Sequence, residues 1–223
     1  MRLHDDWLIW QLADSAFPTG GFAHSGGLEA AWQHGEIRSR ADLMAFAETS
    51  LQQLGYASLP FMRAVWEEPE RLVELDARFD VFTTNHVTNR ASRLQGRAFW
   101  MAAERSFPSV ALDGLRERME AEGFCGHLPP VFGAVTAALG LQKQDAIQLF
   151  FFCYLRGIVA SAVRLGIVGP MEAQSMQHRL SAKAQVVSGE CAEIPVEEAA
   201  QTAPLLDLWQ GAQDRLYSRL FQS

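Results

Sequence analysis

The chain has 223 residues, of which 48% are hydrophobic and 20% charged, and its formal net charge is −7. This composition excludes intrinsic disorder, and the length is sufficient to bury a substantial core. The negative charge gives the chain no general attraction to nucleic acid or to an anionic membrane. The three cysteines are far apart and form no CxxC pair, so neither a zinc site nor a disulfide framework is indicated.

Hydrophobic residues follow helical spacing through the N-terminal half of the chain. Ser39 followed by Asp42 resembles a capping box, and Leu43 and Phe46 continue one helical face after it. A loop rich in helix-breaking residues occupies positions 17–21. The predicted helices in this half cover about residues 5–13, 25–34, 39–54, 59–66, 69–79 and 86–105.

The C-terminal half has the same spacing. Segment 187–195 is short, polar and acidic, and we expect a mobile loop there. The sequence therefore predicts a single all-α domain over residues 1–223, with about eight to ten helices and a C-terminal tail at 217–223. The predicted helices in this half cover about residues 112–121, 130–139, 144–165 and 170–186, with helical spacing again at 205–220.

The predicted helix at 144–165 is the most apolar part of the chain. It contains Arg156 and Arg164, and a helix that spans a bilayer rarely carries two arginines. We therefore expect a buried core helix. The N terminus has acidic residues before a short apolar run, whereas a signal peptide has a basic start and a longer apolar stretch. Together these features predict a cytoplasmic protein that does not enter a membrane.

Motifs that support catalysis or cofactor binding are few. The phosphate-binding patterns GxxxxGK[ST] and GxGxxG do not occur, and neither does HExxH. No two of the six histidines lie three or four residues apart, so we predict no metal site and no cofactor. His24 lies beside Ser25 in a glycine-rich stretch, which leaves a helical enzyme with a pocket at the His24 loop as an alternative.

Arg90, Arg93 and Arg97 lie three and four residues apart on the predicted helix at 86–105. One interpretation is a solvated helix face. A second is a cationic rim that binds an acidic partner or holds a neighbouring helix. A regulator that binds DNA through these arginines is a further hypothesis, which the acidic charge of the chain disfavours.

Two other features are unusual for a globular chain. Arg164 lies late in the most apolar helix, where it could cap that helix or reach an interface, and both interpretations stay open. The tail remains apolar to within two residues of the chain end, whereas chain ends are usually polar. Either the tail folds onto its own core or a partner covers it.

Four segments of the sequence carry a family resemblance. The first reads AFPTGGFAHSGGLE at residues 16–29, and the others are 90–97, 130–133 and 217–221. In order and separation they resemble the urease accessory protein UreF, and the resemblance spans nearly the whole chain.

The resemblance implies an all-helical protein that forms a homodimer and has no catalytic activity of its own. Members of this family bind the accessory protein UreD, also called UreH, which contacts the urease apoprotein. They then recruit the GTPase UreG, which carries nickel. We therefore expect a scaffold that assembles the urease maturation complex for nickel insertion and that contacts neither nucleic acid nor membrane.

The resemblance also implies which residues bind partners. Pro18 and Phe22 would belong to the surface that meets UreG, Arg164 would lie near this surface, and residues 217–221 would become ordered on binding. The full set of expected partner-binding residues is Pro18, Gly20, Gly21, Phe22, His24, Ser25, Arg93, Arg97, Arg164, Tyr217, Ser218, Arg219, Leu220 and Phe221.

Overall fold

The computed structural model of the chain describes residues 3–107, 110–120 and 123–223, and every regular element in them is helical. Helix α3 (Arg40–Gln53) continues through a π-helical turn (Leu54–Ser58) into α4 (Leu59–Glu67). Counted as one helix, these segments bring the α-helices of the described residues to ten, which confirms the prediction. The others are α1 (Leu3–Ala13), α2 (Leu28–Gln33), α5 (Leu72–Phe82), α6 (His86–Ser106), α7 (Val110–Met119), α8 (Leu128–Ala138), α9 (Lys143–Arg164), α10 (Pro170–Glu190) and α11 (Pro204–Ala212).

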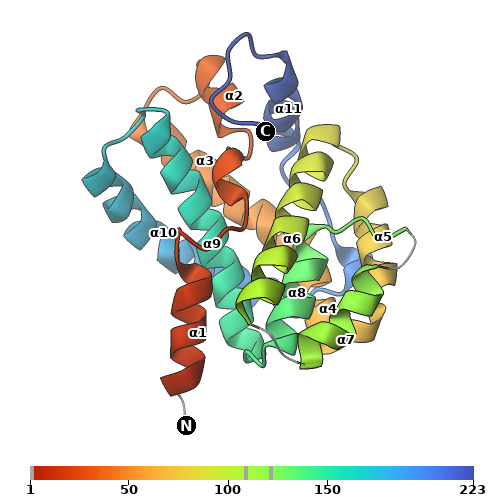
Figure 1. Ribbon diagram of the computed structural model, residues 1–223. Helices are drawn as coiled ribbons and strands as arrows, with labels where there is room; N and C mark the ends of the chain where they lie inside the picture. Colours follow the sequence, from red (N-terminus) through yellow and green to blue (C-terminus); the bar gives the residue numbers. More distant parts are fainter. Residues whose placement is uncertain (1–2, 108–109, 121–122) are drawn as a thin grey trace.

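Helix α8 is the centre of one group of helices. Its residues from Pro129 to Thr136 are all buried, and it packs against α4, α5, α6 and α7 (Figure 1). A helix that is apolar on every side is stable only when other helices surround it. Phe132 of α8 stacks on Phe99 of α6, with ring centroids 4.9 Å apart, and lies 5.1 Å from the ring of Phe150 of α9. These rings join the α8 group to the rest of the core.

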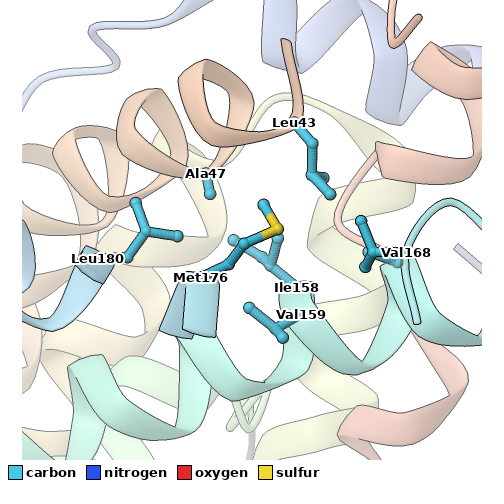
Figure 2. A pocket seen from close by; sticks show the side chains of 8 residues that line it. Leu43, Ala47, Ile158, Val159, Val168, Met176 and Leu180 are labelled. Carbon is cyan, nitrogen blue, oxygen red and sulfur yellow. The ribbon is translucent and has the colours of Figure 1, made fainter. Parts of the chain in front are cut away.

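Helices α3, α9 and α10 form the second group. Figure 2 shows side chains of all three pointing toward one another, among them Leu43 of α3, Ile158 of α9 and Met176 of α10. The gap between them is too small to hold a water molecule. Such close packing is typical of protein interiors and resists any change of side-chain volume.

Helix α9 is long and apolar enough to cross a membrane, and it is the one such helix in the part of the chain that the structure describes. In its most apolar stretch 56% of the residues are buried by α1, α3, α8 and α10. This is the behaviour of a core helix, as the sequence predicts.

The start of α2 and the end of α10 differ from the predicted boundaries. Helix α2 begins at Leu28 rather than near Ser25, because Gly26 and Gly27 adopt left-handed conformations with φ of +64° and +89°. Helix α10 continues to Glu190, so the first four residues of the predicted 187–195 loop are helical. The mobility of the remaining residues stays a prediction. The predicted helix end at Ala121 lies outside the described residues.

The extension of α10 has a packing reason. Val187 is buried beside the π-helical turn, where a Cβ atom on Gly55 would lie 2.6 Å from its Cγ1. Glycine therefore allows α10 to approach the turn closely, and burial of Val187 keeps the last turn of α10 helical. The residues that follow Val187 are mostly polar, so the sequence predicted a loop instead of this contact.

The predicted helical spacing at 205–220 is wrong beyond residue 212. Helix α11 ends at Ala212, one 3₁₀ turn follows at Gln213–Arg215, and the chain then runs without regular structure to Ser223. Backbone groups of this segment bond to the loop and to α2 instead of to one another. Figure 1 shows the C terminus beside α2 and α11, far from the N terminus.

Gly133 provides a test of the packing of α8 on α4. A Cβ atom at this position would lie 2.1 Å from the carbonyl oxygen of Met62, which belongs to the backbone and cannot move aside. We expect Gly133→Ala to lower the free energy of unfolding by about 1–3 kcal/mol, measured by urea denaturation. Gly157→Ala in α9 is the control, since a Cβ atom there meets nothing within 4 Å. The control should be neutral or stabilising by up to about 1 kcal/mol, and equal effects of the two variants would contradict the packing argument.

Candidate functional site

The glycine-rich loop comprises residues 17–27 and connects α1 to α2. Its first residue, Phe17, is buried, with its ring centroid 6.1 Å from that of Phe99 in α6. The loop then turns at Gly20, which has φ of +73° and begins a short 3₁₀ turn. Because Phe17 fixes one end and α2 the other, the residues between them are held at the surface of the core.

Glu29 of α2 binds the tail to the loop. This side chain is buried, and its Oε1 accepts the backbone N–H of Leu220 at 2.6 Å. Its Oε2 accepts the backbone N–H of Phe221 at 3.1 Å and the Nε2–H of Gln213 at 2.6 Å. A buried carboxylate is costly unless it is hydrogen-bonded, so these donors make the tail part of the fold.

The last two residues also bond directly to the loop. The N–H of Ser25 donates to the carbonyl oxygen of Ser223 at 2.5 Å, and the N–H of Gln222 donates to the carbonyl oxygen of Ala23 at 2.8 Å. The Nδ1 of His24 lies 2.5 Å from the Oγ of Ser223. Loop and tail therefore form one surface, which we call the loop–tail surface, although almost 200 residues separate them in sequence.

Arg164, the last residue of α9, lies between two aromatic rings of this surface. Its guanidinium carbon is 3.6 Å from the ring centroid of Phe22 and 4.2 Å from that of Phe221. Its Nη1–H also donates to the carbonyl oxygen of Phe22. A cation over an aromatic ring contributes about 0.5–2 kcal/mol, depending on how far solvent is excluded. Arg164 thus contacts the loop and the tail of its own chain, and its place at an interface stays a prediction.

The loop–tail surface is apolar on its outer side. Phe22 is 72% exposed, Leu220 is 53% exposed, and Tyr217 is fully exposed, whereas Phe221 is buried at 3%. Pro18 is exposed as well. Phe221 thus packs on its own core, as the first alternative predicts, whereas Tyr217 and Leu220 face solvent and their coverage by a partner stays a prediction.

A cavity of about 350 Å³ lies beneath the loop. Its wall is largely apolar and includes Phe99, Phe132 and Phe150, with Arg156 and Arg164 among the polar residues. His24 also lines this cavity, and burial, together with the positive charge of Arg90, lowers its pKa to about 4. Its imidazole is therefore neutral at neutral pH. The predicted site residues that line the cavity are Pro18, Gly20, Gly21, Phe22, His24, Ser25 and Arg164.

The arginines of α6 bind segments of their own chain. Arg90 forms two hydrogen bonds with the carboxylate of Asp214, at 2.8 and 3.1 Å. Arg219 of the tail donates to the same carboxylate at 3.1 Å. The hydrogen bond from Arg90 is the largest cause that holds the pKa of Asp214 below its usual value. Arg90 thus links α6 to the tail.

Arg93 and Arg97 contact a different part of the molecule. The Nη1 of Arg93 lies 3.9 Å from Asp80, and the Nε–H of Arg97 donates to the carbonyl oxygen of Cys125 at 3.1 Å. Neither contact involves the loop or the tail. Of the fourteen residues predicted from the sequence, these two are the ones whose contacts lie elsewhere, and their role in binding a partner stays a prediction.

Glu29 and Gln213, which connect the loop to the tail, are not among the site residues predicted from the sequence. Both are buried, and their side chains bond to each other across 184 positions. Glu29 is the last residue of the glycine-rich motif at 16–29. A single sequence does not indicate that its carboxylate oxygens accept N–H groups from Leu220 and Phe221.

The fold and the loop–tail surface define an all-helical protein with an aromatic and cationic surface at one end. A model of the UreF family matches residues 37–181. The chain is 38% identical over 221 residues to urease accessory protein F of Arabidopsis thaliana, covering 97% of this chain and 92% of that protein. It is 35% identical over 225 residues to urease accessory protein F of Oryza sativa subsp. indica, covering 99% and 86%. It is 29% identical over 220 residues to urease accessory protein UreF of Trichodesmium erythraeum, covering 96% and 94%.

The chain therefore belongs to the UreF family of urease accessory proteins. The family model begins after the loop and ends before the tail, so its match rests on the helical core. The plant relatives align over 97–99% of the chain, so the similarity to them takes in nearly the whole length.

Replacement of Glu29 tests the attachment of the tail. Glu29→Gln keeps the shape of the side chain but places an NH₂ donor where backbone N–H groups need an acceptor. We expect faster hydrogen exchange at the amides of Leu220 and Phe221, with a local loss of about 1–3 kcal/mol. The exposed Glu36→Gln is the control, and unchanged exchange in the Glu29 variant would show that other contacts hold the tail.

His24 predicts a dependence of stability on pH. Its pKa is near 6.5 in the unfolded chain and about 4 in the folded one, so the unfolded state binds the proton more tightly between these values. The free energy of unfolding should fall by about 1–3 kcal/mol from this residue as pH drops from 6.5 toward 4. His24→Gln should reduce the slope in denaturation curves over this window, whereas the exposed His178→Gln should not. Equal slopes in wild type and the His24 variant would refute this assignment.

Proposed function

We propose that this protein is a non-enzymatic scaffold of urease maturation and that its loop–tail surface recruits the GTPase UreG. The observation that carries the proposal is Arg164, which is placed between Phe22 and Phe221. This arrangement holds an aromatic ring at the surface, where Phe22 remains 72% exposed. Aromatic and arginine side chains contribute most of the binding energy in many protein interfaces.

The exposed apolar residues of this surface favour a protein partner. Phe22, Tyr217 and Leu220 belong to segments that are bonded to each other, so they present their side chains together. Exposed apolar groups gathered in one region cost free energy in water until another surface covers them. Arg219 and Asp214 form a polar edge beside these residues. This edge would orient the partner on the surface and add little to the binding affinity.

The attachment of the tail adds to this argument. Residues 217–221 were expected to become ordered on binding, and in the structure Phe221 is buried and donates its N–H to Glu29. A surface that is ordered in advance avoids part of the entropy cost of association. A partner would cover Tyr217 and Leu220 without first having to fold the tail.

The remaining partners follow from the family. The relatives named urease accessory protein support a role in urease maturation. Within this proposal the protein binds UreD (UreH), which contacts the urease apoprotein, and UreG delivers nickel for insertion. We further propose that it acts as a homodimer in the cytoplasm. Binding to UreD/UreH would use a surface other than the loop–tail surface, so that both partners can be present together.

Phe22→Asp tests the recruitment of UreG. The substitution removes the ring that lies on Arg164 and places a carboxylate in the apolar contact. The affinity for UreG should therefore fall by at least about 30-fold. Co-purification of UreG with the tagged protein measures this loss, and circular dichroism should show an unchanged helix content.

Val81→Asp is the matched control, because Val81 of α5 is 78% exposed and lies outside the loop–tail surface. It should retain UreG. Equal recovery of UreG by the Phe22 variant and the wild type would contradict the proposal. Turnover of a substrate by this protein alone, abolished by His24→Ala, would instead support the helical enzyme.

A further inference from the structure

A second group of reactive side chains lies away from the loop–tail surface. Asp80 of α5, Cys125 and His127 each offer one donor atom, and these atoms lie within 4.8 Å of one another. The Nε2 of His127 is 2.9 Å from the Oδ1 of Asp80. The His127 side chain is fully buried, while Asp80 and Cys125 are partly exposed.

The turn that carries Cys125 and His127 is held by a buried carboxylate. Asp76 lies one helical turn before Asp80 and is 0% exposed. Its Oδ2 accepts the N–H groups of Cys125 at 2.6 Å and Gly126 at 3.0 Å, and its Oδ1 accepts the N–H of His127 at 2.7 Å. Three bonds to one carboxylate fix the backbone of this turn, so the sulfur and the imidazole approach Asp80 from a defined direction.

Helix α6 closes the turn from the other side. A Cβ atom at Gly96 would lie 2.2 Å from the carbonyl oxygen of Gly126, so only glycine allows this approach. The Oγ of Ser92 lies 3.1 Å from the Nδ1 of His127 and also accepts the N–H of Leu128 at 3.2 Å. A partner on one nitrogen orients the imidazole and leaves the other nitrogen directed at Asp80, as in many metal sites.

We propose that Asp80, Cys125 and His127 bind a divalent transition metal of the Zn²⁺, Co²⁺ and Ni²⁺ type, which is an activity beyond the proposed docking role. Thiolate, imidazole and carboxylate are the ligands that these ions share, whereas Mg²⁺ and Ca²⁺ prefer oxygen alone. Three protein ligands leave a fourth position, and the exposure of Asp80 and Cys125 lets a solvent molecule occupy it.

The charges around the cluster suit such an ion. The hydroxyl of Ser92 lies on the Nδ1 side of His127, so the Nε2 that faces Asp80 is the atom that would bind the ion. A metal binds the thiolate form of Cys125, so binding releases one proton to solvent. Arg93, at 3.9 Å from Asp80 and 40% exposed, is the cation that a metal would replace as the partner of this carboxylate.

Cobalt titration of the full-length, reduced protein tests the site. We expect one Co²⁺ per chain and a thiolate-to-cobalt charge-transfer band in the near ultraviolet. Cys125→Ser should lose this band, and Asp80→Asn should weaken binding by roughly tenfold or more. Zn²⁺ added afterwards should displace the cobalt and remove the band.

Two control variants separate loss of a ligand from loss of the fold. Cys153→Ser should keep the band, because this cysteine lies beside Leu12 in a different part of the molecule. Arg93→Gln should tighten cobalt binding, since it removes a competing positive charge, and misfolding cannot produce that result. Absence of the band in the wild type, or its persistence in the Cys125 variant, would overturn the proposal. Neither outcome bears on UreG recruitment, which the Phe22 variant tests separately.

Discussion

The buried carboxylate of Glu29 is the constraint on which the loop–tail surface depends. Removing a carboxylate from water costs several kcal/mol unless donors replace the lost hydration, and the donors here come from the last residues of the chain. The helix that carries Glu29 can be buried only if the tail is in place. Tail attachment is therefore coupled to the packing of α2 against α9 and α11, and it does not rest on the apolar contact of Phe221 alone.

This coupling explains why an aromatic ring can remain at the surface. Phe221, held by Glu29, supports one side of the Arg164 guanidinium, and Arg164 in turn supports Phe22. Each of these contacts is weak by itself. Both depend on the buried carboxylate of Glu29, whose oxygens are fully hydrogen-bonded. A ring supported in this way loses little freedom on binding, which favours recognition through Phe22.

The sequence predicts features that depend on neighbours along the chain, and it misses those that depend on distant ones. The capping box of Ser39 and Asp42 forms as predicted, with both reciprocal bonds present, because it needs only four consecutive residues. The start of α2 and the end of α11 were misplaced, since Gly27 and the tail take their conformations from contacts across the fold. The motif at 16–29 marked the loop, but the meeting of His24 with Ser223 required the folded chain. The sequence predicts no metal site, because it has no CxxC pair and no two histidines three or four residues apart, and Asp80 lies 45 residues away from Cys125.

Asp76 and Glu29 show that the fold uses the same device twice. Each is a buried carboxylate on a helix. Each accepts backbone N–H groups from a segment that has no regular secondary structure of its own. Hydrogen bonds to backbone N–H groups fix the path of a segment without using its side chains. The side chains therefore remain free to contact other groups. At Glu29 that freedom leaves Tyr217 and Leu220 facing solvent, and at Asp76 it leaves the sulfur of Cys125 and the imidazole of His127 directed toward Asp80. The helices of the described residues thus position two irregular segments, one that we propose binds a protein partner and one that we propose binds a metal ion.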